Sequence, residues 1–180
     1  MLEKADEDVK NLMRLTKVMT TVASLRYMLH RLRTTGFECT MDSVNEQEML
    51  TTAFVVTYSR LFADGKDVSR ISDRKIPKNL KPFHKELISM RNERYAHNGE
   101  HDSVRKSPEI EFDGAEFYIK INYEISMHVG GRNEWEDLVK FVNEYVYAQI
   151  FKIIERLSEK TGCKWNFPHD LAPEFIGESE

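Results

Sequence analysis

The spacing of apolar residues over the first 35 positions predicts a long helix. Between about Ala5 and Thr34, large apolar side chains recur at alternating intervals of three and four residues, which places them along one side of a helix. Gly36 follows the last of them and favours the end of the helix there. The residues of this apolar seam are Leu15, Val18, Val22, Leu25, Leu29 and Leu32.

A second helix is expected from about Val44 to Ala63. Ser43 lies three residues before Glu46, which is the spacing of a capping box at a helix start. The middle of the segment, residues 53–56, is apolar on every side. A helix that is apolar all round is normally buried, so we expect this one to be central.

A third helix should begin between Asn79 and Pro82, after a polar connection that ends near Pro77. Proline favours the first turn of a helix, where its missing N–H is not needed. Asn98-Gly99 is typical of a helix terminator and predicts the other end.

The apolar period then changes from a helical one to two residues. Five apolar residues alternate with polar ones, and Asp113-Gly114 before them is a favoured hairpin turn. The pattern predicts a β-hairpin over about residues 109–127. The alternating apolar residues are Phe117, Ile119, Ile121, Tyr123 and Ile125.

The last long helix is expected from Asn133 to about Lys160. Asn133 and Glu136 have capping-box spacing, and Gly162 predicts the end. An irregular, aromatic tail, residues 163–180, follows and should fold back on the body, with Trp135 and Trp165 as packing anchors. The predicted inward face of the helix contains Leu138, Val142, Tyr145, Gln149, Ile153 and Leu157.

These elements predict one mainly α-helical domain over residues 1–180. Each helix has one apolar stripe to bury, and packing helices together is the usual way to bury it. The expected fold is a four-to-five-helix up-down bundle, with the β-hairpin inserted between the third and last main helices. The composition agrees, because 41% of the 180 residues are hydrophobic and glycine and proline are sparse.

Charge and cysteine content change the picture in two ways. The N-terminus is charged and resembles no signal peptide, and no apolar run is long enough to span a membrane. The sequence contains only two cysteines, Cys39 and Cys163. We therefore expect a cytoplasmic protein with free thiols and no membrane partner. The net charge is -4, yet residues 60–106 hold twelve Lys or Arg against seven Asp or Glu, a local excess that can attract phosphate.

Arg91, Asn92 and His97 form the most informative motif of the chain. Five residues separate the arginine from the histidine, and the polar asparagine follows the arginine directly. The segment thereby resembles the HEPN superfamily (higher eukaryotes and prokaryotes nucleotide-binding domains). The motif of that family is an arginine, usually followed by a polar residue, and a histidine after four to six intervening positions. The resemblance covers the helical core, about residues 10–160.

The resemblance implies a helical bundle that cleaves RNA as a homodimer, without a metal and without any other cofactor. It points to the toxin-like, abortive-infection branch of the family. A toxin or phage-defence role would add an antitoxin or a defence-system protein as a possible partner. RNA is then the substrate.

The chemistry of RNA cleavage fits these residue types. Attack by the RNA's own 2′-hydroxyl needs one proton removed from it and one supplied to the leaving oxygen, and a histidine, with an ordinary pKa of about 6.5, can do either. The phosphorane that forms is negatively charged, and a planar guanidinium can stabilise it with two hydrogen bonds. These roles belong to His97 and Arg91, and Asn92 is placed to orient the histidine or the phosphate.

Helix geometry limits how these residues can combine. At about 100° per residue, Arg91 and His97 lie about 120° apart around an ideal helix and share no face. Either the helix loosens before His97, as Asn98-Gly99 would permit, or a second chain completes the site, or both. The segment therefore predicts a dimer as much as it predicts a ribonuclease. Arg94 does share a face with His97 and is an expected auxiliary phosphate ligand. Tyr58 and Arg60 on the second helix are weaker auxiliary candidates.

Three other interpretations stay open. In the first, Arg91 pairs with a carboxylate such as Glu86 or Glu93, and His97 is a cation at a helix end. In the second, the bundle is a HEPN-type dimer that binds RNA, a nucleotide or a protein without cutting. In the third, residues 97–101 form the H-x-x-E-H pattern of a class of zinc peptidases, although Asn-Gly in the middle is a poor helix interior.

Overall fold

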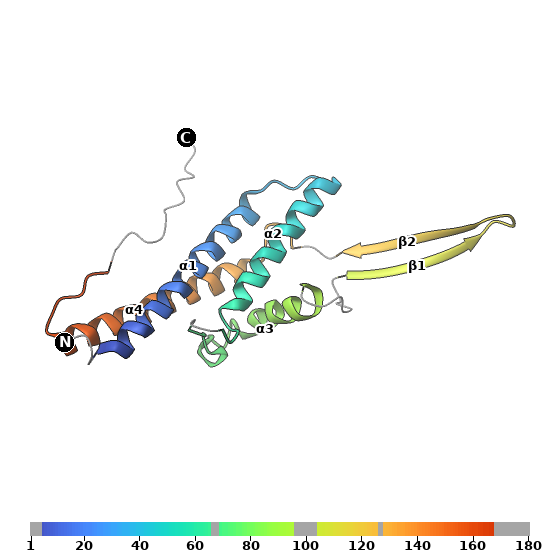
Figure 1. The fold of residues 1–180 in the computed structure, drawn as a ribbon. Coiled ribbons are helices and arrows are strands. Elements are labelled where there is room, and N and C mark those ends of the chain that lie inside the picture. The colour runs from blue at the N-terminus through green and yellow to red at the C-terminus, as the bar shows by residue number, and fades with distance from the viewer. Residues whose placement is uncertain (1–4, 66–68, 96–103, 126–127, 168–180) are drawn as a thin grey trace, which may run out of the picture.

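The computed structural model describes residues 5–65, 69–95, 104–125 and 128–167, with the backbone alone at 104–108 and 121–125. Within these ranges the chain is mainly helical, with one antiparallel hairpin between the third and last main helices (Figure 1). The predicted fold class is thereby confirmed. The elements are α1 (Asp6–Thr34), α2 (Met41–Arg60), the short 3-10 helix η2 (Asp73–Lys75), α3 (Lys81–Ser89), the π-helix η3 (Met90–Tyr95), β1 (Val104–Phe112), β2 (Phe117–Ile125) and α4 (Asn133–Thr161).

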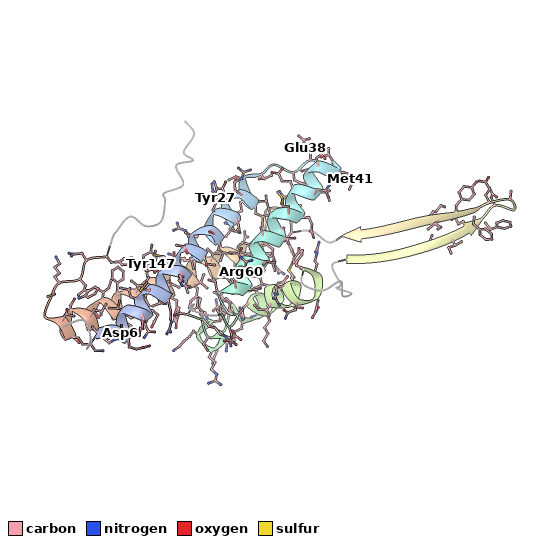
Figure 2. All side chains as sticks on the ribbon, in the orientation of Figure 1. Asp6, Tyr27, Glu38, Met41, Arg60 and Tyr147 are labelled. Atoms are coloured by element: carbon pink, nitrogen blue, oxygen red, sulfur yellow. The ribbon has the colours of Figure 1, made fainter. Side chains whose placement is uncertain are left out.

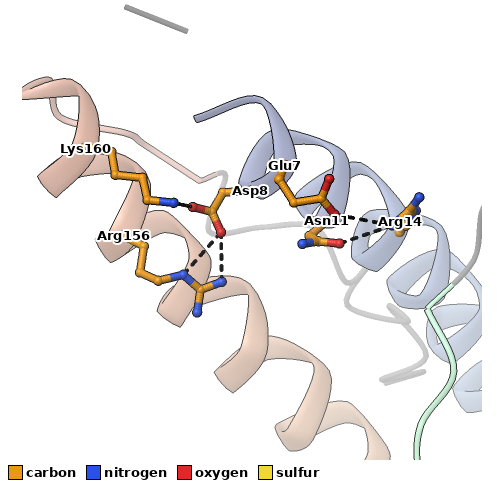
Figure 3. A network of polar contacts seen from close by, with 6 residues as sticks. All are labelled: Glu7, Asp8, Asn11, Arg14, Arg156 and Lys160. Atoms are coloured by element: carbon orange, nitrogen blue, oxygen red, sulfur yellow. Dashed lines mark hydrogen bonds and ion pairs between the residues drawn. The ribbon is translucent and has the colours of Figure 1, made fainter. Parts of the chain in front are cut away.

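The two longest helices, α1 and α4, lie antiparallel along each other. At one end, Asp8 in the first turn of α1 accepts hydrogen bonds from Arg156 and Lys160 near the end of α4 (Figure 3). At the other end, Arg33 of α1 pairs with Glu136 in the first turn of α4. All six residues of the predicted α1 seam are buried, as the three-and-four spacing requires.

Aromatic and aliphatic side chains from α1, α2, α3 and α4 meet in one core. Trp135 is fully buried and stacks on Phe54, with ring centroids 5.0 Å apart, so its predicted role as a packing anchor is confirmed. Trp165 is half-buried, and its indole N–H donates to Thr161 Oγ1 at 3.0 Å. The tail therefore returns to the body as far as Phe167; residues 168–180 lie outside the described residues.

One predicted helix start and two predicted caps are wrong. The cap of α2 is Thr40, whose side-chain oxygen accepts from the Ser43 N–H, so the helix begins at Met41 and ends at Arg60. Thr40 and Ser43 both have hydroxyls that can cap, and the spacing of Ser43 to Glu46 favoured the wrong one. α4 begins at Asn133 as predicted, but its cap position is Arg132, which makes no side-chain cap hydrogen bond.

One further boundary and one face differ from prediction. The hairpin begins at Val104, and its strands pair from Val104 with Ile125 to Phe112 with Phe117. In α4, Val146 and Ile150 take the buried positions, while Tyr145 and Gln149 are half-buried. The predicted end of α4 is correct within one residue, because Gly162 has the left-handed φ of 66° that terminates a helix.

No helix in the described part of the chain is both long and apolar enough to cross a membrane. Cys39 and Cys163 are exposed and belong to no disulfide of the described residues.

Candidate functional site

The helix that contains Arg91 changes character just before it. α3 is an α-helix from Lys81 to Ser89, and residues Met90–Tyr95 then form the π-helix η3. A π-helix joins residue i to i+5, so each turn holds more residues than the 3.6 of an α-helix, and such turns occur frequently at functional sites. The segment that carries Arg91 and Asn92 is therefore not a regular α-helix.

The π-helix decides where Arg91 lies. His84 and Leu87, seven and four residues earlier, are both buried. A regular α-helix would place Arg91 on that same buried face. The wider turn instead leaves Arg91 exposed, together with Asn92 and Glu93.

Arg91 and Asn92 contact each other directly. The Nη1 atom of Arg91 donates a hydrogen bond to the Asn92 amide oxygen at 2.9 Å. The bond restrains the guanidinium and leaves its Nη2 and Nε hydrogens for an anion, since a guanidinium has five donors in a planar fork. The structure therefore brings together two of the three residues of the motif.

Arg94 has a structural position. Its side chain is only 5% exposed, and its Nη2 atom lies 2.7 Å from a carboxylate oxygen of Glu48 on α2. The guanidinium also lies over the ring of Tyr95, 5.2 Å from its centroid. These contacts hold η3 against α2. Because Arg94 is already paired with Glu48, we do not propose it as a phosphate ligand.

Tyr58 and Arg60 do not join Arg91. Tyr58 is fully buried, and its hydroxyl lies 2.9 Å from His84 Nδ1. A buried hydroxyl does not reach a phosphate at the surface. Arg60 is exposed in the last turn of α2 (Figure 2). It lies twelve residues beyond Glu48, the partner of Arg94, which is about 18 Å along the helix axis.

His97 lies outside the described residues, and so do Glu100 and His101 of the H-x-x-E-H pattern. The joining of His97 and Arg91 in one site therefore stays a prediction, as does the helix end at Asn98-Gly99. Among the described residues, no group of three or more His, Cys, Asp or Glu side chains could hold a metal ion.

One expectation of the first alternative interpretation is wrong. Glu86 does not neutralise Arg91, because both of its carboxylate oxygens accept from Arg132, at 2.8 and 2.9 Å. The Arg132 guanidinium also lies over the ring of Phe83, 5.1 Å from its centroid. These contacts tie α3 to the start of α4.

The surface before Arg91 is rich in cations. Arg74, Lys75, Lys78 and Lys85 are exposed, and Lys81 is half-buried. Among the described residues these five form no ion pair, whereas Arg70 pairs with Asp64 and Asp73. Lys81 and Lys85 are four residues apart and lie on one face of α3, which leads toward Arg91.

A buried polar cluster next to this helix did not stand out in the sequence. His84 joins the Tyr58 hydroxyl through Nδ1, and its Nε2 atom is 3.8 Å from the Asp73 carboxylate. Burial lowers the pKa of His84, and the charge of Asp73 opposes this only in part. Burial also raises the pKa of Tyr58 far above its usual value, so its hydroxyl stays protonated. The members come from α2, α3 and η2, and no motif spacing links them.

Comparison of the chain with protein-family models, with curated proteins and with solved structures finds no match.

Proposed function

We propose that the chain is a HEPN-like, metal-independent endoribonuclease that acts as a homodimer. The observation that carries the proposal is the exposed Arg91 guanidinium, held by Asn92 on a π-helix. A regular α-helix would direct Arg91 inward, so its exposure to solvent depends on the π-helix. An exposed, restrained arginine is suited to stabilise the negative charge that develops on a phosphoryl group.

The proposed reaction uses Arg91 and His97 in separate roles. His97 removes the proton of the RNA 2′-hydroxyl, whose oxygen attacks the adjacent phosphorus while the bond to the 5′-oxygen breaks. The leaving oxygen takes a proton from a second histidine, and the products are a 2′,3′-cyclic phosphate and a 5′-hydroxyl. Arg91 stabilises the charge of the phosphorane. His97 of the other chain in a dimer would supply the second histidine.

The cations of α3 and η2 would hold the RNA backbone. Lys85 and Lys81 lie six and ten residues before Arg91, or about 9 and 15 Å along a helix axis. Because phosphate contacts of this kind depend on charge and carry no base information, they fit a substrate bound through its backbone. A toxin or phage-defence role, an antitoxin or other defence-system partner and a cytoplasmic location are parts of the proposal that rest on the family resemblance alone.

The test is RNA cleavage by the full chain with a chelator present. We expect Arg91→Ala to lower the rate about 100- to 1,000-fold, since losing one preorganised donor for a transition-state oxyanion has an effect of that size. His97→Ala should do at least as much. Asn92→Asp should also lower the rate, because a carboxylate in place of the amide would neutralise Arg91.

Lys152→Ala is the matched control. Lys152 is exposed on α4, twenty residues beyond Arg132 and so about 30 Å along the helix from the contact with α3. Its removal changes the charge equally and should leave cleavage unchanged. Equal cleavage by the parent chain, Arg91→Ala and His97→Ala would refute the proposal. RNA binding without products would favour the non-catalytic dimer, and chelator-sensitive peptide hydrolysis would favour the zinc peptidase.

A further inference from the structure

The hairpin of β1 and β2 extends away from the helices as an arm (Figure 1). We use "the arm" for Val104–Ile125. Its strands pair only with each other among the described residues, in a two-stranded sheet. A two-stranded hairpin alone is marginally stable in water and usually needs a further layer against one face. The arm is therefore an element whose stability calls for a partner.

The two faces of the arm differ in chemistry. Ile110 pairs with Ile119, and Phe112 pairs with Phe117, so that all four side chains lie on one face. They are 57–73% exposed, and the two phenylalanine rings contact each other with centroids 4.6 Å apart. We call these four residues the apolar face.

The opposite face of the arm is polar. Glu109 pairs with Lys120 and Glu111 with Tyr118, and Lys120 Nζ forms an ion pair with Glu111 at 2.6 Å. Its tip is closed by Asp113, whose carboxylate accepts from the backbone N–H groups of Ala115 and Glu116. The polar and charged groups of this face thus already form hydrogen bonds and an ion pair within the arm or face water, and they need no partner.

The apolar face is large for a surface that stays in water. A large apolar side chain has roughly 150–250 Å², so four such residues at these exposures present on the order of 500 Å². The largest apolar patch of a typical monomer measures roughly 300–600 Å² and often has a function. A contiguous patch of this size on a thin projecting element indicates an interaction surface.

We propose that the apolar face packs against the same face of a second copy of this chain, around a two-fold axis. Two such faces would bury on the order of 1,000 Å² in total, the minimum expected of a specific interface. A two-fold interface needs only one self-complementary surface, and paired rows of isoleucine and phenylalanine provide it. Two sheets in contact lie about 10 Å apart, with the polar faces directed outward.

Charge argues against RNA or an anionic membrane on the apolar face. Within residues 109–120 there are four acidic side chains and one lysine. Such a surface repels phosphate. The same charges make the two arms repel each other weakly. Salt screens this repulsion, because the Debye length is about 10 Å at 0.1 M salt and shortens as salt rises. Dimerisation should therefore strengthen as salt rises, whereas RNA binding weakens.

Sedimentation equilibrium of the full chain tests the proposal. The parent chain should show a monomer–dimer equilibrium below 100 µM, and the double variant F117T/I119T should raise the dissociation constant at least 100-fold, because it removes four buried apolar side chains per dimer. Threonine keeps a high strand propensity, so the arm can still form. The matched control is Tyr118→Thr, which lies between the two sites on the polar face and should leave the dimer intact.

Amide hydrogen exchange of the parent chain gives a second readout that needs no variant. Exchange within residues 109–120 should slow as protein concentration rises, because dimerisation suppresses opening of the hairpin. A monomer at 100 µM would overturn the proposal. So would a dimer that F117T/I119T leaves unchanged, with exchange in the arm independent of concentration.

The arm inference concerns assembly and does not require RNA cleavage. If F117T/I119T is monomeric and still cuts RNA, the inference about the arm stands and the idea of a site shared between two chains fails. If the parent chain is a dimer through the arm and cuts no RNA, the proposed ribonuclease fails alone.

Discussion

At the scale of single residues, His84 is a buried group whose titration should affect stability near neutral pH. Its folded pKa is lowered by burial, so the unfolded chain takes up a proton first as the pH falls below about 6.5, the ordinary pKa of histidine. We expect the free energy of unfolding to be constant above that pH and to decrease below it, down to the folded pKa. Denaturant unfolding at steps between pH 7.5 and 5 measures this.

The control separates His84 from the other histidines. His84→Gln should be less stable at neutral pH, since Tyr58 loses its imidazole partner, but its stability should vary less with pH. An unchanged slope in His84→Gln would show that the buried imidazole does not titrate as argued.

At the scale of elements, the ion pair between Arg94 and Glu48 should hold η3 in place. Breaking a fully buried pair from one side costs about 3–5 kcal/mol. Glu48 is 33% exposed, so we expect Glu48→Gln to lower the free energy of unfolding by about 2 kcal/mol. Amide exchange in Met90–Tyr95 should accelerate, and RNA cleavage should decrease because Arg91 is carried by the same π-helix.

A nearby carboxylate on the same helix provides the comparison. Glu46 is two residues from Glu48, is 44% exposed and lies 3.9 Å from Arg31. An exposed pair of this kind contributes little, about 0–1 kcal/mol. Glu46→Gln should therefore leave exchange in η3 unchanged, and equal effects of the two variants would contradict a specific role for Glu48.

Helices whose apolar residues recur regularly were predictable from the sequence. α1 and α4 end within one residue of their predicted limits, because their spacing and Gly162 act locally. The start of the hairpin was not predictable, since Lys106 and Pro108 occupy positions that the alternation would give to large apolar residues. The cap of α2 was also not predictable, because Thr40 and Ser43 both have a hydroxyl that can accept a hydrogen bond from the first turn of a helix.

The candidate site was predictable only in part. The motif singled out Arg91 and Asn92, which the structure joins by a hydrogen bond. The contact between Arg94 and Glu48 spans 46 residues of sequence, and that between Tyr58 and His84 spans 26. Contacts at such separations depend on how helices pack. A pattern along one helix therefore cannot show that Arg94 and Tyr58 are already engaged.

At the scale of the whole molecule, polar contacts fasten both ends of the antiparallel pair α1 and α4. Arg33 and Glu136 join one end, and Asp8, Arg156 and Lys160 join the other. Asp8 is buried among these partners, in the first turn of α1, where a negative charge also favours the helix dipole. The contact of Asp8 with Arg156 and Lys160 should therefore make the stability of the bundle depend on pH in the acid range.

The expected effect of Asp8 on acid stability follows from the direction of its pKa. The hydrogen bond from Lys160 lowers the pKa of Asp8 most, and Arg156 adds to this, while burial opposes it. The stabilisation should be complete above about 3.8, the unfolded value, and lost as pH falls through the lower folded pKa. Asp8→Asn should therefore lower the melting temperature at pH 7, and its melting temperature should approach that of the parent chain at pH 3.

Glu7→Gln is the control, because it removes the same charge from the same helix turn. Glu7 lies 3.9 Å from Arg14 (Figure 3). If Glu7→Gln lowers the melting temperature as much as Asp8→Asn, the helix dipole and not the contact with α4 explains the effect.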